Sequence, residues 1–255
     1  MSVFDTVIVV DWASGMASGP RPKKDAIWIG VANARSVEPP LYLPSRRAAE
    51  DWLCARLSEE RAKGHRVLAS FDFPFAYPIG FAKALTGLDD PLMLWAWLAE
   101  RIVDNEQGEN NRFDIAAEIN RTFGGDGPFW GNPLKRDIVG LPRKKSGSSL
   151  NGLPEKRHCE EQDKGLFTCW QLAGAGAVGA QILMGLPVLH RLRERFGKDL
   201  SVWPFEAADA PIVLAEIWPS LLGSVVKKAE AGGEIRDAAQ VRLLSKALAS
   251  LSTEE

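Results

Sequence analysis

Short apolar runs near the two ends of the chain predict the strands of a sheet. Six segments have this pattern: Phe4–Asp11, Asp25–Asn33, Leu41–Pro44, Arg66–Asp72, Leu200–Phe205 and Ile212–Trp218. Runs of four to eight apolar residues bounded by turn residues are typical of buried strands. The loops between the first three are too short for helices, which favours an antiparallel meander. The fourth follows a helix that Ser45 begins and Gly64 ends, so it is expected to lie parallel to its neighbour.

The middle of the chain has helical spacing instead. Apolar residues recur at helical intervals over 79–85, 91–103 and 113–123, and a final amphipathic helix is expected over 233–251. Between them lie a tract rich in glycine and proline, 124–164, and an apolar segment punctuated by glycines, 166–196. The pattern predicts a core sheet at the two ends of a single domain, 1–255, with a helical and loop insertion over 78–200.

Composition and charge narrow the class of protein. The chain has 255 residues, 45% hydrophobic and 25% charged, with a formal net charge of −2, so no global basic field attracts nucleic acid or anionic lipid. No apolar run reaches the roughly 18 residues of a membrane span. Three cysteines with no metal-ligand or disulfide spacing, Cys54, Cys159 and Cys169, favour a reducing, cytoplasmic location.

Four acidic residues stand where acids are costly. Asp11, Asp72 and Glu216 each end or follow a strand-like apolar run, and Asp237 lies in the last expected helix. A buried carboxylate needs a partner, a hydrogen bond or a metal. These acids therefore predict one site at one edge of the sheet, with the oxygen-rich chemistry that suits Mg²⁺ or Mn²⁺. The alternative is that each acid caps a turn or pairs with a cation.

The residues around these acids resemble a known family. The matching pieces are Val9–Ser14, Phe71–Phe75, Glu216–Pro219 and Arg236–Ala239. They are similar to the DUF429 family of the ribonuclease H-like superfamily. The resemblance implies an α/β, ribonuclease H-like fold with a mixed five-stranded sheet in the order 3-2-1-4-5, which makes Asp11 a neighbour of Asp72. One position departs from the family, since Gln240 stands where a second helical acid is frequent, and this puts a two-metal site in doubt.

The resemblance and the acids together lead to a first hypothesis of function. It is a divalent-metal-dependent phosphoryl-transfer or phosphodiester-cleaving enzyme acting on a nucleotide or nucleic acid, with Mg²⁺ or Mn²⁺ as cofactor. Asp11 and Asp72 would share the metal, and Glu216 and Asp237 would complete its shell. Two alternatives stay open. One is a non-catalytic accessory protein that binds a nucleotide or a pterin cofactor, for example in molybdopterin cofactor maturation, and the other is an interaction module whose acids are structural.

Candidate substrate contacts come from three stretches of sequence. Trp12 and Ser14 directly follow Asp11. In the glycine- and proline-rich tract, Phe129 and Trp130 could stack on a base while Lys135, Arg136 and Arg143 pair with phosphate, unless the tract is a solvated loop.

A third stretch has glycines at the spacing of a phosphate loop. Gly174 and Gly176 begin a Gly-x-Gly-x-x-Gly motif and could contact a phosphate at a helix start. A full dinucleotide-binding unit is disfavoured, because the Gly185-Leu-Pro187 segment is expected to break the helix that this reading requires.

Overall fold

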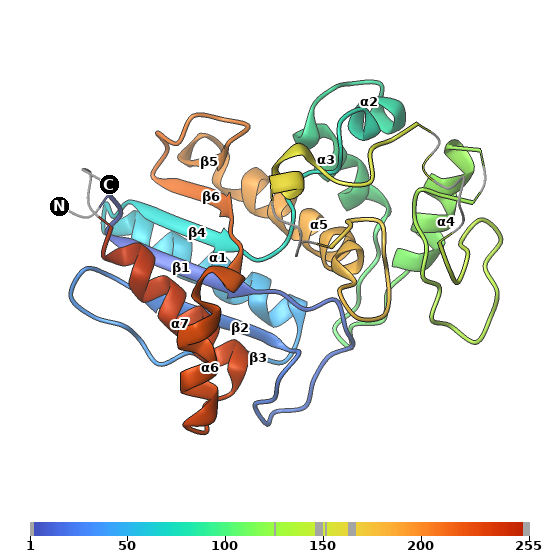
Figure 1. Ribbon diagram of the computed structural model, residues 1–255. Helices are drawn as coiled ribbons and strands as arrows, with labels where there is room; N and C mark the ends of the chain where they lie inside the picture. The colour runs from blue at the N-terminus through green and yellow to red at the C-terminus, as the bar shows by residue number, and fades with distance from the viewer. Residues whose placement is uncertain (1–2, 125, 146–149, 151, 163–166, 252–255) are drawn as a thin grey trace. The chain divides into compact units, whose positions relative to one another are not determined.

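The computed structural model describes residues 3–124, 126–145, 150, 152–162 and 167–251 (Figure 1). Within them the protein is α/β, with one mixed six-stranded sheet and seven α-helices. The predicted α/β class is confirmed. No helix among the described residues is long and apolar enough to cross a membrane.

The sheet has the order β3-β2-β1-β4-β6-β5. Its strands are β1 (Thr6–Asp11), β2 (Ile27–Ala32), β3 (Leu41–Leu43), β4 (Val67–Phe71), β5 (Leu200–Trp203) and β6 (Ile212–Glu216). The first three form the expected antiparallel meander, and β1, β4, β6 and β5 run parallel. The expected count of five strands and its order are wrong, because the segment at 200–203 joins the sheet as an edge strand beside β6.

The helices match the expected segments except near the C-terminus. They are α1 (Arg46–Ala62), α2 (Phe81–Thr86), α3 (Pro91–Arg101), α4 (Arg112–Thr122), α5 (Val178–Phe196), α6 (Gly223–Ala231) and α7 (Arg236–Ala249). Ser45 caps α1 by accepting a hydrogen bond from the Ala48 N–H, as expected. The expected break at Pro187 is wrong, since α5 continues through this proline. Helix α6 was not predicted.

Contacts within the chain define two compact units. The first unit comprises residues 1–73, 105–108 and 192–255, and it holds the whole sheet with α1, α6 and α7. The second unit comprises residues 74–104 and 109–191, and it holds α2, α3, α4 and most of α5. The expected insertion, 78–200, starts a few residues after the start of the second unit. Its last residues, 192–200, belong to the first unit.

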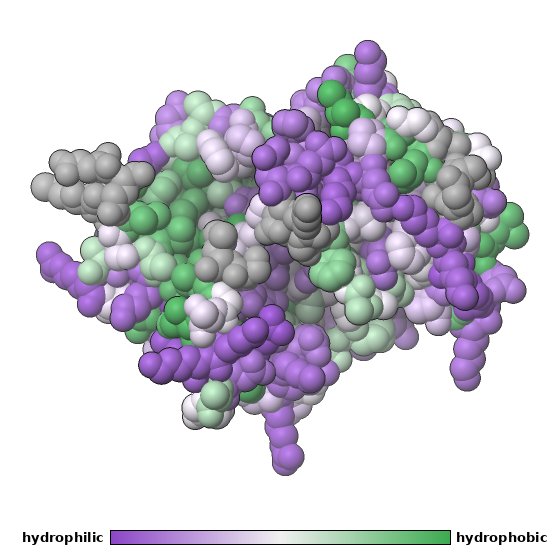
Figure 2. Space-filling model, viewed as in Figure 1, coloured by the Kyte–Doolittle hydropathy of each residue, from purple (hydrophilic) through white to green (hydrophobic). Residues whose placement is uncertain are grey.

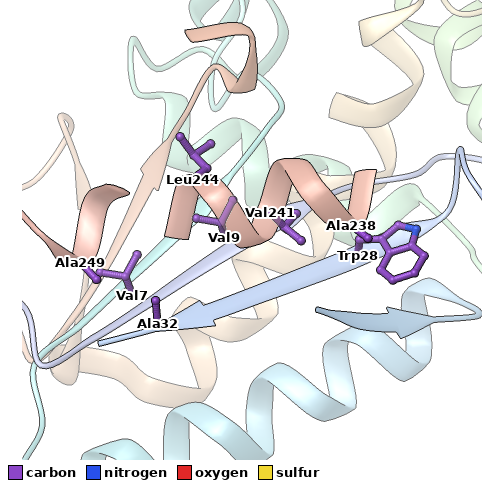
Figure 3. Packing of buried hydrophobic residues seen from close by; sticks show 8 residues of the cluster. All are labelled: Val7, Val9, Trp28, Ala32, Ala238, Val241, Leu244 and Ala249. Atoms are coloured by element: carbon purple, nitrogen blue, oxygen red, sulfur yellow. The ribbon is translucent and has the colours of Figure 1, made fainter. Parts of the chain in front are cut away.

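Helix α7 packs on one face of the sheet at very short range. Figure 3 shows Val7 and Val9 of β1 and Trp28 of β2 meeting Val241 and other apolar residues of α7. A Cβ atom added to Gly30 of β2 would lie 2.2 Å from the Val241 carbonyl oxygen. Only glycine allows this approach, and the approach fixes the depth at which the polar first turn of α7 meets the end of β1.

Candidate carboxylate site

Asp11 and Asp72 are brought together by the parallel pairing of β1 and β4. Val10 is paired with Phe71 in register, so the next residues, Asp11 and Asp72, are neighbours at the carboxyl ends of the two strands. The pairing continues past the strands, because the Asp72 N–H donates to the Val10 carbonyl at 3.2 Å. The Trp12 N–H in turn donates to Asp72 Oδ1 at 2.7 Å.

Both side chains point to the face of the sheet that α7 covers. Residues two apart in a strand share a face, so Asp11 shares the face of Val7 and Val9, which pack against α7. Helix α7 brings Asp237 in its first turn and Gln240 one turn later. The Gln240 side-chain amide donates to Asp11 Oδ2 at 3.1 Å. The helix thus places an acid and an amide beside the strand acids.

A further acid, Asp25, was missed in the sequence. It ends the loop between β1 and β2, and its N–H donates to Asp237 Oδ2 at 2.7 Å. Its φ of 55° lies in the left-handed region, which aspartate tolerates better than most residues. The sequence predicted it as the first residue of a strand, where aspartate is a common turn residue, so it carried no signal that set it apart. Asp11, Asp72 and Asp237, with Asp25 at the margin, are called the carboxylate cluster below.

Glu216 is not brought into this cluster. It is paired in register with Phe71, so it shares the face of Phe71, opposite to that of Asp72. Its neighbour Ile217 is the residue that packs toward α7. Glu216 Oε1 accepts a hydrogen bond from the Trp218 indole N–H at 3.0 Å. The sequence placed Glu216 at the correct edge of the sheet, but the strand alternation turns it to the other side.

Burial and mutual repulsion raise the pKa values of the cluster. The pKa of Asp11 lies well above its usual range, because the group is buried and faces the charges of Asp72, Asp237 and Asp25. Burial likewise raises the pKa of Asp72 to about 7, although the N–H groups of Trp12 and of Asp72 itself oppose the shift, and the charge of Asp237 adds to it. Burial and Asp25 also raise the pKa of Asp237 against the lowering effect of the Asp25 N–H. With a pKa of about 7, the Asp72 carboxyl is only partly ionised at neutral pH.

The donor set fits a hard divalent cation. It consists of carboxylate oxygens, the ligands that Mg²⁺ and Mn²⁺ prefer, in a half-buried position where uncompensated negative charge is costly. Among the described residues, no group of three or more His, Cys, Asp or Glu side chains already has the arrangement of a formed metal site. One oxygen of each of Asp11, Asp72 and Asp237 instead accepts an N–H hydrogen bond. The other oxygens of these carboxylates are the ones that a cation would use.

Comparisons of the chain with protein-family models, with curated proteins and with solved structures gave no match. The candidate site therefore rests on its own geometry and electrostatics.

Of the residues next to Asp11, Trp12 does not offer its ring to a substrate. The Trp12 side chain is 1% exposed and packs against Phe71 and Phe73, so the expectation of a substrate contact by its indole is wrong. Its backbone serves the site by holding Asp72. Ser14 is half-buried in the loop that follows, and its role as a substrate contact stays a prediction.

The expected aromatic contacts belong to the second unit. Phe129 is fully buried and packs against Tyr77, Phe81 and Trp170, so it forms the core of that unit and the expectation that it stacks on a base is wrong. Its backbone is held at both ends by the side-chain amide of Asn120. Trp130 is half-buried, and its backbone pairs with Trp170 and Leu172.

The expected phosphate-binding cations of the second unit mostly hold its own loops. Arg136 Nη2 donates to both carboxylate oxygens of Asp114, at 2.7 and 2.9 Å. Arg143 pairs with Asp137 at 2.7 Å and donates to the Leu134 carbonyl at 2.7 Å. Lys135 is exposed. These contacts give Arg136 and Arg143 a structural role, and phosphate binding by the three cations stays a prediction.

Gly174 and Gly176 form the turn that leads into α5. Both have positive φ, 95° and 74°, and a Cβ atom on Gly176 would lie 2.3 Å from the Phe167 ring. Local packing thus explains both glycines without a ligand. Residues 167–173 form no strand, only a single bridge between Gln171 and Trp130, so the strand that a dinucleotide fold needs is absent from them. Leu166, the first residue of the apolar segment 166–196, lies outside the described residues.

Proposed function

We propose that the protein is a divalent-metal-dependent enzyme that transfers a phosphoryl group or cleaves a phosphodiester in a nucleotide or nucleic acid. The observation that carries this proposal is the convergence of Asp11, Asp72 and Asp237, whose pKa values are all raised by burial and by neighbouring acids. Perturbed acids of this kind are concentrated at functional sites. A purely structural cluster would lose stability when these carboxylates are replaced with neutral groups, whereas the raised pKa values mean that this cluster would gain stability.

Each residue of the cluster has a role that follows from its position. Asp11 and Asp72, on adjacent strands, would hold the cation from the sheet, and Asp237 would hold it from α7. A bound Mg²⁺ or Mn²⁺ would polarise the phosphoryl oxygens and make a coordinated water more acidic. Gln240 fixes the orientation of Asp11 through its amide, and the Trp12 N–H fixes that of Asp72. Since Glu216 faces the other way, we propose that the cation has three protein carboxylates from this set rather than four.

We also propose that the first unit is a ribonuclease H-like domain of the DUF429 type. Three antiparallel strands, a helical crossover and parallel strands beside β1 support this assignment. So does the position of the acids at the ends of β1 and β4 and on α7. The additional edge strand β5 is an addition to the expected five.

Thermal unfolding with Mn²⁺, Mg²⁺ or EDTA tests the metal. A ligand that binds only the folded state raises the melting temperature, and 100 Kd of free metal stabilises by about 2.7 kcal/mol. We expect a Mn²⁺-dependent rise that Asp11→Asn and Asp72→Asn remove and that Glu216→Gln leaves in place. Hydrolysis of a generic phosphodiester that survives Asp72→Asn would contradict the assigned chemistry.

One observation favours a second candidate, the non-catalytic binding protein. N–H donors already occupy one oxygen of each of the three carboxylates, so the acids have protein hydrogen-bond partners beside any cation. If metals leave the melting temperature unchanged while a nucleotide or a pterin raises it, this candidate replaces the enzyme.

A further inference from the structure

The loop between β1 and β2, residues 12–26, leaves from one acid of the cluster and returns at another. It begins directly after Asp11 and ends at Asp25, whose N–H contacts Asp237. The loop therefore lies next to the cluster at both of its ends.

Hydrogen bonds along its whole length hold this loop in place. The buried Arg46 of α1 donates to the carbonyl oxygens of Ala13, at 3.3 Å, and Gly15, at 2.5 Å. Further along, the Ala17 N–H donates to Gln107 and the Ser18 N–H to Pro44. The Tyr42 hydroxyl donates to the Gly19 carbonyl at 2.7 Å, and the Trp28 indole donates to the Lys23 carbonyl at 2.9 Å. The backbone is therefore ordered before any ligand arrives, which lowers the entropic cost of binding.

This ordered loop presents three exposed cations, Arg21, Lys23 and Lys24, and α7 adds the exposed Arg236 one residue before Asp237. Within the described part of the chain, none of the four forms an ion pair with an acidic side chain. Figure 2 shows hydrophilic residues along the lower edge of the view, where Figure 1 draws this loop and α6. We call Arg21, Lys23, Lys24 and Arg236 the basic rim.

The basic rim lies within electrostatic reach of the carboxylate cluster. The charges of Arg236 and Lys24 lower the pKa of Asp237, and the charge of Arg236 also lowers that of Asp11. Arg21 and Lys23 are not among the largest charges that act on these acids, so compensation of the acids accounts mainly for Arg236 and Lys24.

We propose that the basic rim binds the phosphates of a single-stranded nucleic acid and leads the chain into the carboxylate cluster. This inference rests on the proposed function and names its substrate class. Exposed cations on a loop beside the cluster match the phosphates that flank the one bound at the cluster. The net charge of −2 provides no wider field, so the attraction is local. Four cations on one loop and one helix end suit one strand better than the two backbones of a duplex.

The salt dependence of binding tests the rim. A fluorescent single-stranded oligonucleotide is titrated with the full chain in EDTA at several salt concentrations, for the unaltered protein and for Arg21→Gln/Lys23→Gln. The slope of log K against log salt is about −0.7 per phosphate contact for single strands, so losing two contacts should reduce its size by about 1.4. We expect the variant to bind on the order of tenfold more weakly at 0.1 M salt, a loss of about 1.4 kcal/mol.

A matched control comes from the other end of the sheet. Arg195 and Lys198 are exposed and precede β5, whereas the cluster lies at the carboxyl ends of the parallel strands. Arg195→Gln/Lys198→Gln removes the same charge and should leave the slope unchanged. Equal slopes for both variants, or equal losses, would overturn the inference. So would a duplex or a nucleoside triphosphate that binds as tightly as the single strand.

The outcomes separate this inference from the proposed function. Oligonucleotide binding that depends on Arg21 and Lys23, without metal-dependent turnover, would support nucleic-acid binding by the basic rim and contradict the proposed enzymatic function. A Mn²⁺-dependent rise in melting temperature, with no change in the salt slope of Arg21→Gln/Lys23→Gln, would support the metal site and contradict nucleic-acid binding by the basic rim.

Discussion

A buried or half-buried acid lies at each end of strand β1. The surroundings lower the pKa of the acid at the start of the strand and raise the pKa of the acid at its end. At its start, the Thr6 hydroxyl donates to Glu60 of α1 at 2.7 Å, and His65 and Arg56 contact the same carboxylate at 2.7 and 2.9 Å. Burial raises the pKa of Glu60, but the hydrogen bonds from His65 and Thr6 and the charges of Arg56 and Lys63 outweigh it and lower that pKa to about 2. At the other end, Asp11 faces three other acids and its pKa is raised.

The contrast teaches that this fold is able to compensate a buried acid and does not do so at the carboxylate cluster. Glu60 is 2% exposed, yet donors surround it. The cluster has an amide, backbone N–H groups and the nearby charges of Arg236 and Lys24, and its pKa values are nevertheless raised by burial and by the neighbouring acids. Stability does not require acids in that arrangement, which supports the proposal made above that they bind a cation.

The largest expected loss of stability comes from removing Glu60, the acid whose charge is compensated. Glu60→Ala leaves Thr6, Arg56 and His65 without their shared acceptor and opens space in the core. Removing one partner of a buried charged network costs about 3 kcal/mol. Urea unfolding at pH 7 should show this loss of stability, and the exposed Glu59→Ala should show little change. A loss no larger than that of the control would mean that the network is not stabilising.

Acid pH should act on the same network in the unaltered protein. The pKa of Glu60 is lower in the folded state than its usual value of 4.5, so its stabilising contribution is present above that value. It is lost as the pH falls from 4.5 towards about 2. Urea unfolding between pH 5 and pH 3 should show a steeper decline than in Glu60→Gln.

The next effect tests the contact that sets the position of α7. Gly30→Ala places a Cβ atom against the Val241 carbonyl oxygen, 2.2 Å away before relaxation. Overpacking of this kind costs about 2 kcal/mol. It should also weaken the Mn²⁺-dependent rise in melting temperature, because α7 carries Asp237 and Gln240.

Gly223→Ala is the matched control for this change. Gly223 lies in α6 with nothing within 4 Å of an added Cβ atom, so alanine should preserve stability and metal binding. If Gly30→Ala behaves like Gly223→Ala, the short approach of α7 does not position the site.

The sequence predicted most of the framework of this site. The apolar runs and the capped helix between them predicted β1 and β4 as strands that lead into acids, and the strand order implied by the family resemblance placed Asp11 beside Asp72. It could not exclude Glu216, because the face of that residue depends on the register of β6. It also missed Asp25, whose proximity to Asp237 spans 212 positions in the chain. Phe129 and Arg136 were predicted to contact a ligand. Composition alone does not show whether such residues pack within their own unit or are exposed to solvent.

A smaller effect, a gain of stability, is expected when a charge is removed from the carboxylate cluster. Asp72→Asn keeps the acceptor for the Trp12 N–H and removes the charge. The pKa of Asp72 is higher in the folded state, about 7, than its usual value of 3.8, so its ionisation destabilises the fold as the pH rises through this range. Asp72→Asn should therefore be more stable than the unaltered protein at pH 8, by about 1.5 kcal/mol. The advantage should vanish near pH 4 in urea unfolding without metal. A variant that is less stable at both pH values would contradict the raised pKa.

The smallest expected change in stability comes from adding a further negative charge to the carboxylate cluster. Gln240→Glu replaces the amide that donates to Asp11 with another acid. In EDTA it should lower stability by about 1 kcal/mol at pH 8, because like charges repel in a half-buried site. With Mn²⁺ the loss should be reversed, since a further carboxylate strengthens cation binding. Gln240→Ala, which removes the amide without adding charge, is the control, and equal behaviour of the two variants in Mn²⁺ would show that position 240 does not face the cation.

Calorimetric titration with Mg²⁺ or Mn²⁺ in buffers of different ionisation enthalpy is the most direct test of the carboxylate cluster as a cation site. Because Asp11 and Asp72 hold protons with raised pKa values, binding at pH 6 should release protons, and the release should fall as the pH approaches 8. Asp11→Asn/Asp72→Asn should abolish the binding heat. Metal binding that releases no proton at pH 6, or that persists in the double variant, would contradict the assignment of the cation to these acids.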